Sequence, residues 1–305
     1  MSVIVLEGPD LAGKTTVARW LQAELTQRGV ISTYIKRGPI RDDPMTEYLR
    51  PLDALANDPR FNVSHTLILD RWHVGELIYG PLLRGRSELT AQQANYIEMV
   101  LQTLGCAFIH VTTDVSILED RWDIRGDSLI KREWLRRISD EYWRYTASRP
   151  HWENRVAGSE MSLPPSQPSP FLGTKRGGWY VGPPKPAVLL LGDERNDHTF
   201  VWPFVPQRAT SGHWLMGALQ ASKVNHMQVG IVNACELLEI DLYTLWSELG
   251  EPPVVTLGRN AERAWRRLDA AVPAAAMYLH HPQHQRRFYF QSFAEYGEQI
   301  KKVMR

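Results

Sequence analysis

The sequence is poor in cysteine, and this scarcity excludes two common classes of domain. Its 305 residues contain two cysteines, Cys106 and Cys235, which lie far apart and inside apolar runs. A disulfide scaffold or a structural zinc site needs more cysteines than two, so we expect neither. Both side chains are predicted to be buried thiols of a protein in a reducing compartment.

Long apolar runs and an excess of one charge are also lacking. No apolar stretch reaches the roughly 18 residues that a membrane-spanning helix needs, and the opening MSVIVLEG lacks the charged start of a signal peptide. We therefore expect a soluble, cytoplasmic protein with no membrane partner. Lysine and arginine number 35 against 34 aspartates and glutamates, for a net charge of +1. This balance excludes a uniformly basic nucleic-acid coat, though not a local basic groove.

The N-terminal half has the pattern of an α/β domain with a parallel sheet. Short apolar runs alternate with segments of helical periodicity, as in strands joined by helical crossovers. The first strand ends in a glycine-rich turn, and the first helix ends before Gly29. We predict strands at residues 2–7, 66–69 and 108–111, and helices at 14–28, 91–104 and 130–145.

A change of composition divides the chain. Residues 156–186 are rich in Pro, Gly and Ser and have no periodic apolar face, which predicts a linker, part polyproline-like and part flexible. We thus expect a domain at 1–155, a linker at 156–186 and a second α/β domain at 187–305. In this second domain we predict strands at 187–191, 228–234 and 253–257, and helices near 215–223 and 260–268.

The turn after the first strand matches a phosphate-binding loop. Residues 8–15 fit G-x-x-x-x-G-K-[ST] without a mismatch, between a predicted strand and a predicted helix. Backbone N–H groups of such a loop bind phosphate oxygens, Lys14 reaches the β- and γ-phosphates, and the Thr15 hydroxyl binds Mg²⁺. A glycine-rich turn that precedes a helix by chance is the alternative. The predicted ATP-binding residues are Gly8, Pro9, Asp10, Leu11, Ala12, Gly13, Lys14, Thr15 and Thr16, with ATP and Mg²⁺ as cofactors.

The loop resembles that of thymidylate kinases, whose signature reads E-G-x-D-x-x-G-K-T and here begins at Glu7. Leu69-Asp70-Arg71-Trp72 looks like the D-R-[YWF] motif of that family. The resemblance, which covers about residues 1–150, implies that Asp70 lies near Mg²⁺ and that Arg71 binds acceptor phosphate. An ordinary ion pair at a strand end is the alternative for Asp70 and Arg71.

Residues 120–127 look like the lid that closes over ATP in thymidylate kinases, with its R-x-x-x-R-G-x-D core. Residues 133–145 resemble the helix beneath this lid. The resemblance implies that Arg121 and Arg125 neutralise phosphate charge as the lid closes. A solvated charged helix face is the alternative, since the two arginines stand at helical spacing.

The acceptor motif departs from that family. Where thymidylate kinases usually have R-E-P-G-G, residues 36–41 read KRGPIR, which keeps Arg37 and loses the rest. Asp10, whose family counterpart faces the sugar of the acceptor, is retained. The acceptor is therefore expected to be thymidine-like without being simple dTMP.

Residues 187–305 resemble the uracil-DNA glycosylase superfamily, more weakly. The segments that carry this resemblance are 191–196, 202–205, 232–234, 255–261 and 281–283. It implies a base-binding pocket in which Phe204 or Trp202 stacks on a flipped base, Asn233 reads the pyrimidine edge and His281 contacts O2. Arg286 and Arg287 would hold backbone phosphate.

Glycosylase chemistry is disfavoured by one part of this second domain. Arg195 and Asn196 replace the Pro-Gly of the first motif, although Asp193 or Glu194 could still activate water. A binding role is therefore expected. A strand-end turn for Asn233 and a satisfied surface histidine for His281 are the alternatives.

The two resemblances together suggest an ATP-dependent kinase that phosphorylates the hydroxymethyl group of 5-hydroxymethyluracil in DNA. Certain phages hypermodify thymine in this way, so the resemblance implies the cytoplasm of an infected bacterium. The expected partners are ATP and DNA that carries a modified pyrimidine, or a free dNMP. One alternative is a kinase of dTMP or of a modified dNMP. Another is a DNA repair protein that binds base lesions or acts as a glycosylase.

Overall fold

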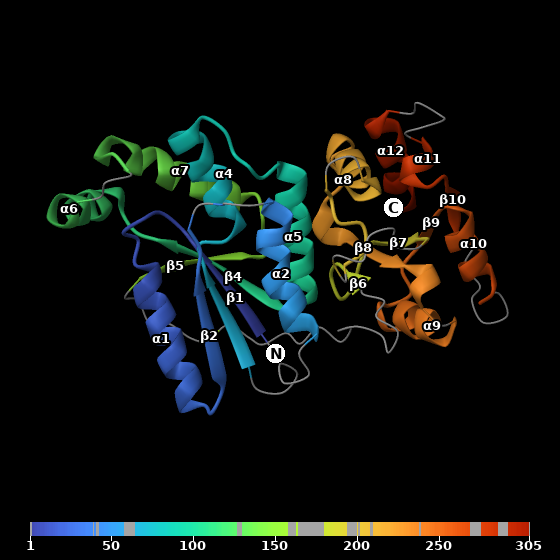
Figure 1. Ribbon diagram of the computed structural model, residues 1–305, viewed down its shortest axis with the longest axis horizontal. Helices are drawn as coiled ribbons and strands as arrows, with labels where there is room; N and C mark the ends of the chain where they lie inside the picture. The colour runs from blue at the N-terminus through green and yellow to red at the C-terminus, as the bar shows by residue number, and fades with distance from the viewer. Residues whose placement is uncertain are drawn as a thin grey trace. The chain divides into compact units, whose positions relative to one another are not determined.

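The computed structural model in Figure 1 divides into two compact units. The first comprises residues 1–48, 57–90 and 104–168, and the second comprises 49–56, 91–103 and 169–305. This grouping by contact differs from the boundaries predicted at 155 and 187, which stay a prediction. The structure describes residues 2–38, 40, 43–57, 65–126, 130–157, 163, 180–193, 200, 202–207, 210–237, 239–268, 276–285 and 292–304.

A five-stranded parallel sheet forms the centre of the first unit. Its strand order is β2-β3-β1-β4-β5, and every neighbouring pair is parallel. This confirms the predicted α/β class for the N-terminal half. The strands are β1 (Ser2–Glu7), β2 (Ile31–Lys36), β3 (His65–Asp70), β4 (Cys106–Thr112) and β5 (Trp152–Val156).

The position of β1 determines where this unit can bind a ligand. β1 pairs with β3 on one side and with β4 on the other. The chain runs from β1 to β2 on one side of β1, and it crosses from β3 to β4 on the other side. Where the strand order reverses in this way, an open parallel sheet has a crevice at the carboxyl ends of its strands. The loop after Glu7 therefore lies at the usual ligand site of an open parallel sheet.

The helices of the first unit agree in part with the prediction. α1 was predicted to within a residue, whereas the helix predicted from residue 130 begins later. Lys131 has an extended backbone, so a short 3₁₀ turn comes before the helix. The helices are α1 (Lys14–Gln27), the first turn of α2 (Pro44–Asn57), α4 (His73–Arg84), α6 (Val115–Arg125), the turn η1 (Arg132–Trp134) and α7 (Leu135–Ala147).

The second unit also has a five-stranded sheet, in the order β10-β9-β7-β8-β6. Four of its strands are parallel, and the edge strand β6 pairs antiparallel with β8. The strands are β6 (Tyr180–Val181), β7 (Val188–Gly192), β8 (Val229–Asn233), β9 (Val254–Leu257) and β10 (Met277–Leu279).

The strand β6 lies inside the segment predicted to be a linker. Tyr180 and Val181 are both buried and pair with β8. The Tyr180 hydroxyl donates to the carbonyl of Pro183 at 2.5 Å. The prolines and glycines around this aromatic and β-branched pair hid a two-residue strand.

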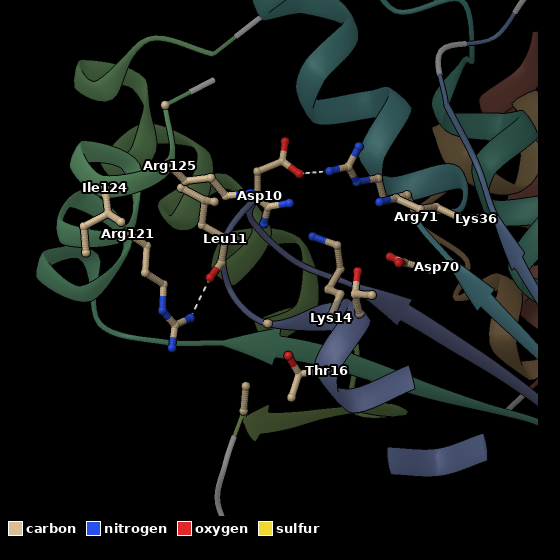
Figure 2. A pocket seen from close by; sticks show the side chains of 14 residues that line it. Asp10, Leu11, Lys14, Thr16, Lys36, Asp70, Arg71, Arg121, Ile124 and Arg125 are labelled. Carbon is tan, nitrogen blue, oxygen red and sulfur yellow. Dashed lines mark hydrogen bonds and ion pairs between the residues drawn. The ribbon is translucent and has the colours of Figure 1, made fainter. Parts of the chain in front are cut away.

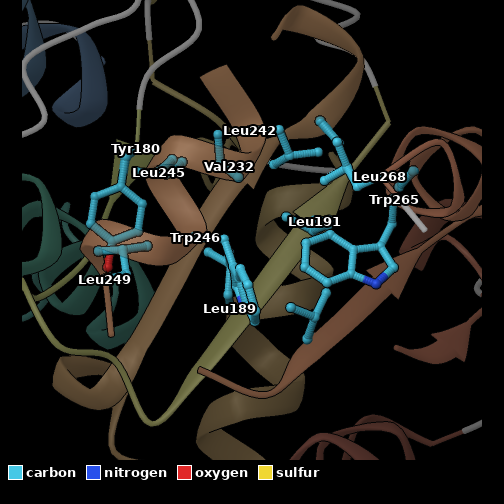
Figure 3. Close-up of a cluster of buried hydrophobic side chains, with 13 residues drawn as sticks. Tyr180, Leu189, Leu191, Val232, Leu242, Leu245, Trp246, Leu249, Trp265 and Leu268 are labelled. Atoms are coloured by element: carbon cyan, nitrogen blue, oxygen red, sulfur yellow. The ribbon is translucent and has the colours of Figure 1, made fainter. Parts of the chain in front are cut away.

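Helices pack on both faces of the second sheet. A cluster of buried side chains joins Leu189, Leu191 and Val232 of the sheet to Trp246 and Trp265 of two helices (Figure 3). The helices of this unit are α5 (Ala91–Thr103), α8 (Ser211–Ala221), α9 (Glu239–Glu248), α10 (Arg259–Arg266), α11 (Pro282–His284) and α12 (Phe293–Val303), with the turns η2 (His226–Gln228) and η3 (Ala234–Glu236).

Other predictions concerned the thiols and the membrane. Cys106 is half-buried, and Cys235 is exposed because it follows the buried end of β8 in a surface turn, so the prediction of two buried thiols was wrong. Among the described residues, no helix is long and apolar enough to span a bilayer.

Candidate nucleotide-binding site

The loop between β1 and α1 passes very close to the neighbouring strand. A Cβ on Gly8, whose φ is +145°, would lie 2.2 Å from the carbonyl oxygen of Val111, a contact that backbone cannot relieve. Gly13 has a φ of +101° and caps α1, and none of the described side chains caps that helix end. The free N–H groups and the positive end of the helix dipole therefore face the loop, as an anion-binding site requires.

A cavity of about 730 Å³ opens at this loop (Figure 2). Lys14 and Asp70 point into it from one side, and Arg121 approaches from α6. Its lining is mostly polar, with cations on several sides. The lining residues are Asp10, Leu11, Gly13, Lys14, Thr15, Thr16, Lys36, Asp70, Arg71, Arg121, Ile124, Arg125, Gly126 and Ala157.

Lys14 is a buried cation that donates hydrogen bonds to its own loop. It is 5% exposed, and its Nζ donates to the carbonyls of Gly8 and Pro9, each at 2.7 Å. Burial lowers the pKa of Lys14 to about 8, although the nearby carboxylates of Asp70 and Glu7 raise it. The positive charge of the ammonium group is thus only partly balanced by nearby carboxylates, and phosphate oxygens would supply the remaining negative charge.

Asp70 offers a carboxylate oxygen to the same cavity. The side chain is buried, and its Oδ2 accepts from the Tyr34 hydroxyl at 2.5 Å, which together with burial raises the pKa of Tyr34 to about 12. Its Oδ1 has no hydrogen-bond partner among the described residues. An orphaned carboxylate oxygen in a phosphate cavity fits a divalent cation.

The donor set near Asp70 suits Mg²⁺ in particular. The Thr15 hydroxyl hydrogen-bonds to the same Tyr34, which places it beside Asp70. Mg²⁺ typically takes one or two protein ligands and fills its remaining positions with substrate phosphates and water. In the described part of the chain, no group of three or more His, Cys, Asp or Glu side chains is placed to hold a metal ion.

Arg71 follows Asp70 in a strained backbone conformation. Its φ is +61°, in the left-handed region that non-glycine residues rarely adopt, and its N–H donates to Leu6 O at 3.0 Å. This conformation turns the guanidinium group toward Asp10 of the phosphate loop, with which it forms an ion pair. Asp70 and Arg71 therefore point to different partners: the Asp70 carboxylate lines the larger cavity, and the Arg71 guanidinium group pairs with Asp10.

A second cavity of about 120 Å³ adjoins the first. Asp10 and Arg71 line both cavities. The smaller one is an aromatic slot with charges at its edges, since it contains three aromatic side chains and three arginines. Its lining comprises Asp10, Arg37, Gly38, Tyr48, Arg71, Trp72, Gly75, Glu76, Tyr79, Leu83, Arg84 and Ile130.

Arg37 lies in this slot but is already engaged. Its guanidinium is 3.1 Å from the Glu47 carboxylate and 5.0 Å from the centre of the Trp72 ring. A second charged pair joins Arg84 to Glu76, which is buried, at 2.5 Å. The slot therefore offers a set of paired charges, and Tyr79 is its half-buried aromatic side chain.

Glu7 connects the phosphate loop to the aromatic slot, a role that the sequence did not reveal. It is fully buried, and its Oε1 accepts from the N–H groups of Trp72, Val74 and Gly75 at 2.7, 3.0 and 3.2 Å. Burial raises the pKa of Glu7, against the lowering effect of His73 and these hydrogen bonds. A glutamate at the end of an otherwise apolar buried strand was the signal that could have revealed it.

The two predicted lid arginines both line the larger cavity. Arg121 donates to the carbonyl of Leu11 in the phosphate loop at 2.6 Å, whereas Arg125 is exposed near the end of α6. Ile124, between them, is 87% exposed, an unusual state for a large apolar side chain. Asp127, the last residue of the predicted lid motif, lies outside the described residues.

The second unit brings its predicted base-binding residues together at the carboxyl edge of its sheet. Asn233 ends β8, His281 follows β10, and the rings of Phe204 and His281 are 5.9 Å apart. A Cβ on Gly192 would lie 2.1 Å from the Phe204 ring and 2.7 Å from Asn233 Oδ1, so both side chains converge on the end of β7. Because β7 pairs with β8 on one side and β9 on the other, this is again a switch point.

The individual roles at this edge differ from the prediction in part. Asn233 is 3% exposed and its amide donates to Glu236 at 3.1 Å, and burial lowers the pKa of the half-buried His281. Trp202 is 1% exposed, so it cannot offer a face to a base, and Phe204 remains the candidate. Glu194, Arg195, Asn196, Arg286 and Arg287 lie outside the described residues.

The strand, glycine loop and helix of the first unit define a P-loop nucleotide-binding unit, and its parallel five-stranded sheet fits a P-loop kinase fold. No family model matches the chain. The SPbeta prophage-derived protein YorR of Bacillus subtilis (strain 168) is 26% identical over 142 residues, which span 47% of this chain and 80% of YorR.

Solved structures with similarity to the chain include two nucleotide complexes. The crystal structure of YorR from Bacillus subtilis with phosphorylated GDP shares 24% identity at a TM-score of 0.41, over 52% of this chain and 86% of that one. The structure of deoxyadenosine kinase from M. mycoides with bound dCTP shares 16% identity at a TM-score of 0.32, over 52% and 92%.

Proposed function

We propose that the chain is an ATP-dependent phosphotransferase of the thymidylate kinase type. The observation that carries this proposal is the pair of adjoining cavities. One has the features of a triphosphate site, the other has those of a site for a planar ring, and Asp10 and Arg71 line both. Two substrates bound there would meet across this ion pair, as transfer of a phosphoryl group between them requires.

The residues of the larger cavity would then have distinct roles. Lys14 binds the β- and γ-phosphates, Thr15 and Asp70 hold Mg²⁺, and Arg121 and Arg125 neutralise charge on the transferred group. A metal ion held by these residues would supply positive charge that offsets the negative charge of the phosphates. Lys14 exchanges its two bonds to loop carbonyls for bonds to phosphate, so the loop needs little rearrangement.

The reaction is an in-line transfer. An acceptor hydroxyl oxygen forms a bond to the γ-phosphorus, and the bond from that phosphorus to the bridging oxygen of ADP breaks. The acceptor proton leaves late, since a loose transition state needs little base catalysis. With Asp70 assigned to the metal, Asp10 is the carboxylate in the acceptor slot that can receive this proton.

We infer that the acceptor is the hydroxymethyl group of 5-hydroxymethyluracil in DNA. The aromatic slot suits a pyrimidine, which can stack on the half-buried ring of Tyr79. Arg37, the residue that would meet a free monophosphate by family resemblance, is held by Glu47 instead. An acceptor without a terminal monophosphate, such as a nucleotide inside a polymer, leaves that pair intact.

The second unit supports a polymeric acceptor. The carboxyl edge of its sheet combines an aromatic ring, a buried amide and a half-buried histidine, which together suit a pyrimidine turned out of a duplex. We therefore propose that this unit has a uracil-DNA glycosylase-like fold and captures the target base as it leaves the duplex, before the base enters the aromatic slot. The prophage origin of YorR is consistent with a phage setting and with the cytoplasm of an infected bacterium.

A free-nucleotide kinase is the second candidate, acting on dTMP or on a modified dNMP. The retained Asp10 inside the acceptor slot favours it. A repair protein that binds base lesions or removes them as a glycosylase has less support, because the ATP site is complete.

The discriminating experiment offers four acceptors to the full chain with Mg²⁺ and ATP that carries a radioactive γ-phosphate. The acceptors are duplex DNA with 5-hydroxymethyluracil, unmodified DNA, dTMP and 5-hydroxymethyl-dUMP. We expect label only in the modified DNA, lost in a Lys14→Ala variant and kept in the control Lys302→Ala, whose lysine is exposed in the second unit. Label only in the monophosphates would establish the free-nucleotide kinase instead.

A further inference from the structure

Helix α10 of the second unit carries a stripe of exposed arginines. Arg259, Arg263 and Arg267 recur every four residues, and the helical backbone continues through Arg267. All three side chains are exposed, whereas Ala261 and Trp265 on the opposite face are buried. With a rise of about 1.5 Å per residue, successive arginines stand about 6 Å apart.

This stripe lacks the balance of an ordinary solvated helix face. Glu262, the acid within this helix, is 2.6 Å from Arg266, which is outside the stripe. Arginines at i and i+4 repel one another, and Arg259 stands at the positive end of the helix dipole. The mutual repulsion of the three arginines and the position of Arg259 both destabilise the isolated helix. A bound anion would offset the repulsion and would interact favourably with the helix dipole.

The stripe begins beside the carboxyl edge of the second sheet. Gly258 caps the helix directly after β9, and the N–H of Ala261 donates to Asp193 Oδ1 at 2.7 Å at the end of β7. Figure 1 shows α10 next to β9 and β10. An extended polyanion that lies along α10 is therefore led to the edge of the sheet where Asn233 and His281 lie.

We propose that Arg259, Arg263 and Arg267 bind successive phosphates of a DNA strand. The spacing of the stripe is comparable to the separation of phosphates along a nucleic-acid backbone, and a row of guanidinium groups suits phosphodiester oxygens. The proposal deepens the proposed function by naming the surface that holds the polymer. It rests on that function for the choice of DNA over RNA.

The test measures how DNA binding depends on salt. Full chain with all three arginines changed to glutamine is titrated into fluorescent duplex DNA, single-stranded DNA and RNA of one sequence, between about 50 and 200 mM salt. The slope of log K against log salt is negative, and each lost phosphate contact reduces its magnitude by about 0.9 on duplex DNA. We therefore expect the magnitude of the slope to be smaller by about 2 to 3 in this variant. A matched variant, Lys185→Gln with Lys223→Gln and Lys302→Gln, removes three exposed positive charges elsewhere in the unit. We expect its slope to change by less than about 1.

The outcomes separate this proposal from the proposed kinase. An unchanged slope in the stripe variant, an equal drop in the matched variant, or tighter binding of RNA than of DNA would each overturn the role of α10. If wild-type protein binds DNA through the stripe and phosphorylates none, the kinase proposal fails and the inference stands. If a stripe variant with a wild-type slope still labels DNA, the role of α10 fails and the kinase proposal stands. Thermal unfolding of both variants checks that their fold is intact.

Discussion

The two sheets place a candidate site at the same topological position and equip it with opposite chemistry. In each, the strand that comes first among the parallel strands, β1 or β7, lies between neighbours on both sides. After β1 the chain continues into Lys14 and an uncapped helix, which attract phosphate. After β7 it continues into Asp193, which repels phosphate and already accepts the N–H of Ala261. Topology thus selects where a ligand binds, and the charged side chains and helix end that follow the strand select the charge of that ligand.

Glycine has a different task at each position. Gly8 lies against the backbone of β4, so that the loop can pass over its neighbour, and Gly192 lies against the Phe204 ring and the Asn233 amide. One glycine brings backbone close to backbone. The other brings two recognition side chains close to the strand end.

Substituting these glycines is expected to give the largest contrast. Gly8→Ala forces Cβ against Val111 O at a φ that alanine disfavours, so we expect about 2 to 3 kcal/mol lower unfolding free energy. Displacement of the loop should reduce phosphoryl transfer by about 100-fold or more. Gly192→Ala meets the Phe204 ring and the Asn233 amide, which are side chains rather than backbone, so a smaller loss of about 1 to 2 kcal/mol is expected. Denaturant unfolding measures both, and equal losses would contradict the distinction.

Removal of the Asn233 amide should separate the function of the site in the second unit from that of the nucleotide cavity. Asn233→Ala is expected to lower transfer to modified DNA by about 10- to 100-fold, since a base edge loses its partner. ATP binding should not change, because the nucleotide cavity belongs to the first unit. Gln220→Ala, which removes an exposed amide from α8, is the control. An equal loss of ATP affinity in Asn233→Ala would show that the two sites are not separate.

The smallest expected effect is the pH dependence of ATP binding. In the nucleotide-free protein Lys14 has a pKa of about 8, and bound phosphates raise it. Above pH 8, binding must therefore take up a proton, so affinity should fall as pH rises, by up to about tenfold per pH unit. Calorimetry from about pH 7 to pH 9 measures this, and Lys14→Gln should bind weakly with no such slope. A flat wild-type profile would show that Lys14 does not titrate in this range.

The sequence predicted the buried strands and the phosphate loop well because those features are local. β1, β3, β4, β7, β8 and β9 are short apolar runs, and the loop is defined by residue types at fixed spacing. β2 was not predicted because its side chains are mostly exposed or half-buried, so no apolar run marks it. β5 reads WENRV, in which charged residues interrupt the pattern.

The parts of the site that were not predicted depend on distant partners. The contact of Glu7 with Trp72 joins residues 65 positions apart, and that of Tyr34 with Asp70 joins residues 36 positions apart. Arg71 was expected on acceptor phosphate, and its pairing with Asp10 follows from a left-handed φ that residue type does not indicate. Such arrangements arise from tertiary packing, and apart from the glutamate that ends the apolar strand β1, the sequence carries no local trace of them.

The buried carboxylate of Glu7 has one further consequence. It ends the strand that leads into the phosphate loop, and it also holds three N–H groups at the start of α4, which lines the aromatic slot. A thermal displacement of this strand end therefore carries both cavities in the same direction. The displacements of the phosphate cavity and of the aromatic slot are therefore correlated. The distance between the two bound substrates then varies less than the position of either cavity.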